Sequence, residues 1–163
     1  MSTLDVAIDE ETWAAASPDR QTEWDAAIRE LTDPTTLVIR PDVRKILVGL
    51  TEQRVELDVR GEGDAALATI TIPHDLLAAP IREYVDIVRQ LARTDQAGGG
   101  LARIEALDMA KKVTHDRGGR AVKRACRELE LDMKTARRLF TLVLSLRVDT
   151  TRLHGIHGHR RVR

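Results

Sequence analysis

Short runs in the first half of the chain alternate between apolar and polar residues, which is the period of a half-buried β-strand. Five runs show this pattern, at residues 3–9, 35–39, 44–50, 55–60 and 65–72. In the first run, Leu4, Val6 and Ile8 share one side. The connections between the other four runs are too short for parallel crossovers, so we expect those strands to pair antiparallel as a meander.

One helix is predicted between the first two runs. Ser17 is a suitable N-cap, Pro18 stands at the first helical position, and Asp33-Pro34 ends the segment. The apolar face of this helix consists of Trp24, Ala27, Ile28 and Leu31.

From Pro73 onward the apolar residues recur with the period of a helix. A first helix contains Pro80, which begins or kinks it, and residues 95–100 form a flexible connector with three glycines. A second helix runs over residues 101–115 and is closed by Gly118-Gly119, and a third covers residues 120–129. We expect the second helix to turn inward Leu101, Ile104, Leu107, Ala110 and Val113.

The last helix is capped by Asp132, extends to about Val148 and is apolar around most of its circumference. We expect it to be either the central buried helix or a subunit interface.

The fold class that follows is α+β, with a small antiparallel sheet in the N-terminal half packed against a C-terminal helical bundle. Residues 1–150 form a single domain, with mostly strands and one helix over 1–72 and helices over 73–148. The basic, His-containing tail over residues 151–163 is expected to be disordered.

Composition supports a soluble globular domain, since 42% of the 163 residues are hydrophobic and 32% are charged. The formal net charge is zero, but residues 1–100 carry 10 Lys or Arg against 19 Asp or Glu, whereas residues 101–163 carry 16 against 7. Three explanations of this charge asymmetry stay open. The opposite charges of the two halves neutralise each other within one chain, copies of the chain associate head to tail, or a basic C-terminal surface binds an anionic partner. The few aromatic residues argue against stacking on unpaired bases, and they are Trp13, Trp24, Tyr84 and Phe140.

The chain lacks the features of export and of membrane insertion. Residues 1–11 contain four acids, no Lys or Arg and no apolar run, unlike a signal peptide. The longest strongly apolar stretch, residues 139–146, is far below the roughly 20 residues that span a bilayer. We therefore expect a cytoplasmic protein without membrane contact. The single cysteine, Cys126, is expected to be a small, half-buried structural residue.

Two segments of the helical half resemble a known family. The first is Ile104-Glu105-Ala106-Leu107-Asp108-Met109 followed by Lys111-Lys112 and His115, and the second is Asp132 with the block Thr135 to Leu142. Both are similar to uncharacterised protein family 0262, a group of small bacterial proteins, and the likeness covers roughly residues 3–147. It includes Ile8-Asp9-Glu10 and Arg82-Glu83-Tyr84, and it departs at Ala110, where family members have glycine, as in a distant member. The resemblance implies no particular activity.

Residues 121–140 resemble the turn and second helix of a helix-turn-helix, with Cys126 as the small residue, Leu131 as the apolar plug and Asp132 as the cap. Thr135, Arg137 and Arg138 would be the DNA contacts. The alternative is a capped helical hairpin in a core, since Glu130 stands where a turn glycine is usual and an acid beside the groove would repel phosphate.

A second candidate site combines two helices. Asp108, Lys112 and His115 are spaced four and three residues apart and share one helix face, to which Arg137 or Arg138 from the last helix would add cations. Together these residues would form a ligand or anion pocket. The alternative is an Asp108–Lys112 surface pair beside a solvated His115.

A third candidate is the cluster of His154, His157 and His159 near the C-terminus, which could bind a metal opportunistically. We do not expect a structural metal site there, because such a site needs four rigidly held ligands. No complete catalytic signature or cofactor motif is present in the sequence, so we expect no cofactor and favour a non-enzymatic protein.

The sequence thus favours a cytoplasmic regulatory or assembly protein that forms homo-oligomers and binds an anionic or protein partner. The first alternative is a DNA-binding protein that uses residues 121–140. The second is a small enzyme or ligand-binding protein with a pocket between the C-terminal helices.

Overall fold

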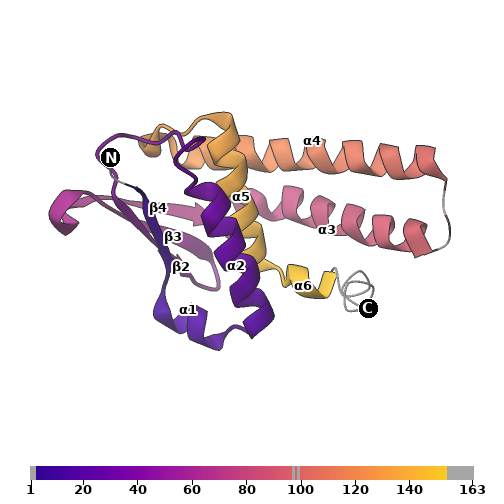
Figure 1. Cartoon of the computed structure of the whole chain (residues 1–163), viewed down its shortest axis with the longest axis horizontal. Helices are drawn as coiled ribbons and strands as arrows, with labels where there is room; N and C mark the ends of the chain where they lie inside the picture. Colours follow the sequence, from indigo (N-terminus) through magenta and orange to yellow (C-terminus); the bar gives the residue numbers. More distant parts are fainter. Residues whose placement is uncertain (1–2, 97, 99, 154–163) are drawn as a thin grey trace.

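The structure is a computed structural model that describes residues 3–96, 98 and 100–153. It has a four-stranded sheet in the N-terminal half and long helices in the C-terminal half, so the α+β class is confirmed (Figure 1). The strands follow the order of the chain across the sheet: β1 (Asp5–Ile8), β2 (Lys45–Leu50), β3 (Arg54–Arg60) and β4 (Ala66–Pro73).

The sheet is mixed. β2, β3 and β4 form the antiparallel meander that short connections require, whereas β1 pairs with β2 in parallel. A parallel neighbour needs a long crossover, and two helices supply it: α1 (Glu10–Ala15), which the sequence did not reveal, and α2 (Pro18–Leu31). Asp9 caps α1 by accepting a hydrogen bond from the Thr12 amide at 2.9 Å.

The strand predicted at residues 35–39 is wrong, because this segment bonds to the helices and not to the sheet. The Val38 amide donates to Thr135 Oγ1 at 3.1 Å, and the Arg40 amide donates to the Leu129 carbonyl at 2.8 Å. These bonds use the backbone groups that a strand would need for its ladder.

The inner face of the sheet belongs to one hydrophobic core that also contains buried residues of α2 and of the last long helix, such as Trp24 and Phe140. The helical half comprises α3 (His74–Gln96), α4 (Leu101–Ala125), the 3₁₀ turn η2 (Arg127–Leu129), α5 (Met133–Arg147) and α6 (Thr150–Leu153). α3 and α4 lie side by side and project as a hairpin beyond the sheet, α2 and α5 (Figure 1). Among the described residues, no helix is both long and apolar enough to cross a membrane.

α4 does not end at Gly118-Gly119, as the sequence predicted, but continues to Ala125. Both glycines are buried where α4 crosses α5. A Cβ atom on Gly118 would lie 2.4 Å from the Phe140 ring, and one on Gly119 would lie 2.6 Å from Arg137 Cγ. The glycines therefore permit close helix packing and are not a C-cap.

The inward face predicted for α4 is also largely wrong. Leu101 is 72% exposed and Val113 is 52% exposed, and of the five expected residues only Leu107 is buried. The buried face consists of Leu107, Thr114, Gly118, Gly119, Ala121 and Val122. The predicted face was centred correctly on Leu107 but was too wide, because Leu101 and Val113 lie about 120° from Leu107 around the helix.

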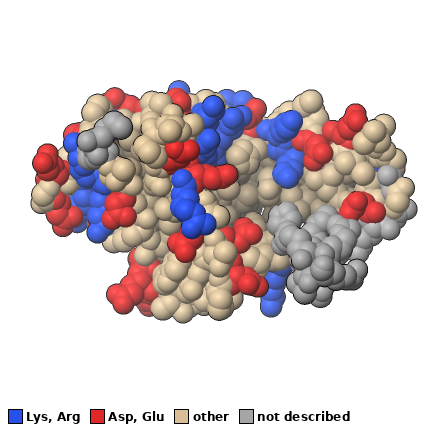
Figure 2. All heavy atoms as spheres, viewed as in Figure 1, with Lys and Arg blue, Asp and Glu red and all other residues tan. Residues whose placement is uncertain are grey.

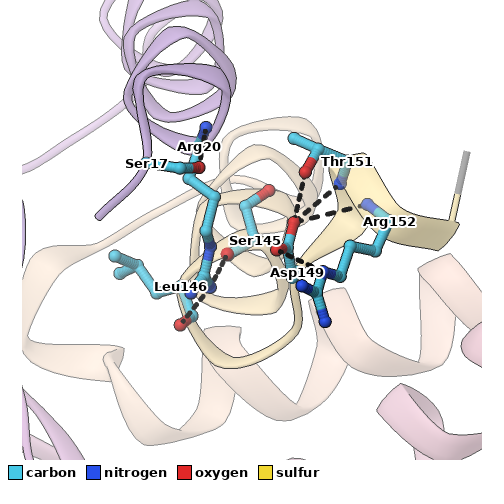
Figure 3. Close-up of polar contacts among 7 residues, drawn as sticks. All are labelled: Ser17, Arg20, Ser145, Leu146, Asp149, Thr151 and Arg152. Atoms are coloured by element: carbon cyan, nitrogen blue, oxygen red, sulfur yellow. Dashed lines mark hydrogen bonds and ion pairs between the residues drawn. The ribbon is translucent and has the colours of Figure 1, made fainter. Parts of the chain in front are cut away.

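α5 is the central buried helix, as predicted. Its N-terminus is capped by Asp132, which accepts from the Thr135 amide at 2.8 Å. At its other end, Arg20 of α2 reaches the carbonyls of Ser145 and Leu146, each at 3.1 Å (Figure 3). A cation that bonds to the last carbonyls of a helix also lies favourably in the helix dipole.

Residues 151–153, predicted as the start of a disordered tail, instead belong to α6 (Thr150–Leu153). Asp149 caps this turn by accepting hydrogen bonds from the Thr151 hydroxyl and from the Thr151 and Arg152 amides (Figure 3). His154, His157 and His159 lie outside the described residues.

Candidate functional site

α3, α4 and α5 meet around a hollow of about 250 Å³, which we call the three-helix hollow. It is lined by Tyr84, Lys111, Lys112, His115, Asp116 and Arg137. Three of the residues predicted for the anion pocket, Lys112, His115 and Arg137, are therefore brought together. Tyr84 and Lys111 belong to stretches that resemble the family, Arg82-Glu83-Tyr84 and the segment from Ile104 to His115, but neither had been predicted as a site residue.

His115 is held in one orientation by its surroundings. Its Nε2 lies 2.6 Å from Thr141 Oγ1, and that hydroxyl donates to the Arg137 carbonyl at 3.1 Å. A carbonyl only accepts, so Thr141 gives its proton to Arg137, and Nε2 of His115 must carry the proton of the other bond. The ring also packs edge-on against Phe140 at 5.4 Å between centroids.

Burial lowers the pKa of His115 below its usual 6.5, and the positive charge of Arg137 acts in the same direction. The imidazole is therefore neutral at pH 7, with Nδ1 as an acceptor that has no hydrogen-bond partner among the described residues.

The charges in the three-helix hollow are unbalanced. Arg137 Nη1 bonds to Asp116 Oδ1 at 2.7 Å, and this bond lowers the pKa of the Asp116 carboxyl. Within the described part of the chain, Lys111 and Lys112 have no ion pair. Burial raises the pKa of Tyr84, as does the negative charge of Glu23, so its phenol stays protonated. Three cations against one carboxylate suit a small anion.

Two residues of the predicted anion pocket lie elsewhere. Asp108 is exposed on α4 and does not line the hollow. Arg138 follows Arg137 by about 100° around α5 and donates instead to the Thr36 hydroxyl. Of the residues predicted for the anion pocket, Lys112, His115 and Arg137 therefore line one hollow, and Asp108 and Arg138 do not.

The residues proposed to contact DNA are engaged inside the fold. Thr135 is fully buried and accepts the Val38 amide, so its side chain is not on the surface that a duplex would reach. Arg137 and Arg138 are half-buried and bonded to Asp116 and Thr36. The segment has instead the geometry of the alternative, a capped helical hairpin whose turn ends at Glu130 in the left-handed region, with φ of 56°.

Cys126 is fully buried rather than half-buried, and burial raises the pKa of its thiol to about 12, with a contribution from Glu128. A thiol with this pKa is a packing group and not a nucleophile. Among the described residues, no group of three His, Cys, Asp or Glu side chains is arranged to hold a metal ion.

A second surface on α4 was not predicted. Arg120, Lys123, Arg124 and Arg127 are all exposed and line a hollow of about 390 Å³ near the C-terminus of the helix. We call these four residues the basic patch. None of them takes part in an ion pair within residues 3–96, 98 and 100–153. Figure 2 shows Lys and Arg gathered along the upper edge of the molecule, where α4 lies.

The signal for this patch was present in the sequence. Residues 117–127 contain five Lys or Arg and no Asp or Glu, and residues three or four positions apart share a helix face. All four residues of the basic patch lie within the helix predicted over residues 120–129, so their shared face could have been recognised from the sequence.

Comparison with known proteins identifies relatives over most of the chain. Residues 2–149 match the Uncharacterised protein family (UPF0262). A UPF0262 protein of Acidiphilium cryptum is 34% identical over 145 residues, which cover 86% of this chain and 89% of the relative. A UPF0262 protein of Hyphomonas neptunium is 31% identical over 154 residues, 92% of this chain and 94% of the relative. No solved structure matches the chain. The match over nearly the whole length shows that the chain belongs to the UPF0262 family.

Proposed function

We propose that this chain is a cytoplasmic, non-enzymatic regulatory or assembly protein that binds an acidic protein partner through the basic patch. The observation that carries the proposal is the convergence of Arg120, Lys123, Arg124 and Arg127 on one hollow without an ion pair to any described acid. Four neighbouring cations repel one another, and an anionic surface would relieve that repulsion and speed the encounter.

An acidic protein is favoured over a nucleic acid because the DNA contacts that the sequence offered are engaged inside the fold. Thr135 is fully buried, and Arg137 and Arg138 are bonded to Asp116 and Thr36.

The three-helix hollow supports a second candidate function, the binding of a small anion. The supporting observation is the lining of Lys111, Lys112 and Arg137 against the single carboxylate of Asp116. The acceptor Nδ1 of His115 suits an anion that still carries an O–H group, such as hydrogen phosphate. The two functions use different residues and are separable by mutation.

The proposal is tested with two fluorescent probes, a poly-glutamate peptide and a 20-base-pair DNA duplex, by anisotropy at low and high salt. We expect the full chain to bind the peptide at low salt and to lose affinity at high salt. In R120E/R124E, binding should fall at least tenfold. The matched control is R89E/R93E, which reverses two exposed arginines with the same spacing on α3.

Absence of peptide binding at low salt, or an equal loss in both double variants, would refute the proposal. If the duplex binds and the peptide does not, and R120E/R124E abolishes duplex binding, the patch is a DNA-binding surface and the alternative from the sequence replaces our proposal. A small-anion function predicts instead that H115Q, and not R120E/R124E, alters the binding of inorganic phosphate.

A further inference from the structure

The N-terminal half of α4 presents an apolar stripe to solvent. Ala102, Ala106, Met109 and Val113 are exposed, with Met109 at 61% and Val113 at 52%. Their spacing of four, three and four residues keeps them on one side of the helix, the pattern of a two-helix seam. Nothing in the described part of the chain covers this stripe, because α3 and α5 pack against the opposite side, around Leu107.

We propose that a second copy of this chain covers the stripe, with the two α4 helices antiparallel about a two-fold axis that passes between residues 107 and 108. In this antiparallel arrangement each stripe residue of one helix faces a different stripe residue of the other helix. Ala106 of one copy then lies opposite Met109 of the other, and Ala102 lies opposite Val113. Each layer joins a small side chain to a large one, which lets the helices approach closely without a void.

Charge selects the antiparallel direction. Glu105 and Lys112 flank the stripe on the same side, are both exposed, and have no ion pair among the described residues. In the proposed register, Glu105 of one copy lies within about 3 Å, along the helix axis, of Lys112 of the other. Two symmetric ion pairs result. A parallel pairing would instead place this flank of the two copies on opposite edges of the seam, so Glu105 of one copy could not reach Lys112 of the other.

The register also fits the rest of the fold. The α4 helix of the second copy would begin, at Leu101, opposite residue 114, one turn before Gly118, where α5 crosses. The second copy therefore avoids α5 and leaves Arg120 to Arg127 uncovered. This inference goes beyond the proposed function, since the basic patch could bind its partner from a monomer as well as from a dimer.

The proposed α4 seam also changes which surface we expect to mediate self-association. The sequence suggested the apolar C-terminal helix, but α5 is buried in its own chain and cannot serve without unfolding. Four apolar layers make a small contact, at the low end of specific interfaces, so we expect a dissociation constant on the order of micromolar.

Sedimentation velocity of the full chain over about 1–200 μM tests the proposal. The wild type should form dimers that dissociate on dilution. M109E places a carboxylate in the seam and should be monomeric throughout. The matched control is L47E, which adds the same charge at an exposed apolar residue on the open face of the sheet and should dimerise as the wild type does. Circular dichroism checks that both variants are folded.

The two-fold register has a more specific test. E105K and K112E should each weaken the dimer at least fivefold, because each creates two like-charge contacts, and the double variant E105K/K112E should restore it. Within one chain the two residues are two turns apart, so the rescue cannot arise inside a monomer.

A wild type that remains monomeric, an M109E variant that still dimerises, or a charge swap that gives no rescue would each overturn the proposal. A monomeric wild type that binds vesicles containing anionic lipid, with binding lost in M109E, would assign the stripe to a lipid surface instead. None of these outcomes depends on the peptide binding that tests the basic patch.

Discussion

The crossing of α4 and α5 allows a sharp test of why α4 contains two adjacent glycines. In isolation, G118A should stabilise a helix by about 1 kcal/mol, because alanine is the better helix former. At this position, however, the new Cβ would lie 2.4 Å from Cε1 and Cζ of Phe140, at least 1.0 Å short of ordinary contact at 3.4 Å. Phe140 is fully buried and its ring packs against His115, so it has little room to move.

Overpacking of this kind costs up to about 3 kcal/mol, so we expect G118A to lower the free energy of unfolding by a net value of about 2 kcal/mol. The midpoint of thermal unfolding would fall by about 4–8 °C for a chain of this length. Urea unfolding followed by circular dichroism measures the loss, and the m-value should stay constant. G49A is the control, since its Cβ would meet only Asp9 Oδ2 at an ordinary 3.7 Å.

A double-mutant cycle identifies the cause. Leucine lacks the two ring atoms that approach Gly118 most closely, so G118A should cost at least about 1 kcal/mol less in an F140L background than in the wild type. If G118A proves neutral or stabilising in the wild type, or costs the same in both backgrounds, our account of this crossing is wrong.

Three further predictions concern single residues. D132A removes the cap of α5 and should cost about 1 kcal/mol in urea unfolding, whereas D132N should retain most of that stability; equal losses would contradict a capping role. Because the pKa of His115 is lowered from 6.5 in the folded state, the unfolded chain binds more protons, and the free energy of unfolding should fall as the pH drops below 6.5. H115Q should remove that pH-dependent loss, which is at most about 1.4 kcal/mol per pH unit. Equal losses of stability in the wild type and in H115Q between pH 7.5 and 5.5 would contradict this role of His115. Cys126 should react with a thiol reagent only in denaturant, because it is buried and the pKa of its thiol is about 12; rapid reaction of the folded protein would contradict its placement.

The sequence was sufficient where local chemistry decides the structure. Ser17 before Pro18 and Asp132 before the last helix are capping signals that act within a few residues, and both helices begin where these signals predict. The alternation of residues 44–50, 55–60 and 65–72 likewise predicted correctly that one face of each strand is buried.

The errors arose where distant residues decide. Residues 35–39 have a strand-like pattern, but the Val38 amide bonds to Thr135, 97 positions later in the chain, and the amide of Arg40, just after the segment, bonds to Leu129. Gly118 and Gly119 are ordinary signals for a helix end, yet the ring of Phe140 requires them inside a helix. Periodicity cannot report such contacts, because it describes one element at a time.

The candidate site was likewise predictable where local spacing decides and not where distant contacts decide. Lys112, His115 and Arg137 were predicted from their helix faces and line one hollow. The sequence left open whether Arg137 or Arg138 would complete it, and Arg138 contacts Thr36, which lies far away in the sequence. The basic patch lies within the helix predicted over residues 120–129, so local spacing was sufficient to find it.

The attachment of α2 to the end of α5 has a consequence for biosynthesis. Trp24 donates its indole N–H to the carbonyl of Ser145, a contact between residues 121 positions apart. The ribosome therefore completes the sheet, α3 and α4 before the helix that fills the core exists as a chain. Until then the nascent protein exposes Trp24 and the apolar side of its sheet, surfaces that invite aggregation and that chaperones bind. Folding of the whole molecule thus waits for its last long helix, and a transcript truncated before residue 133 would yield a product that cannot bury its own core.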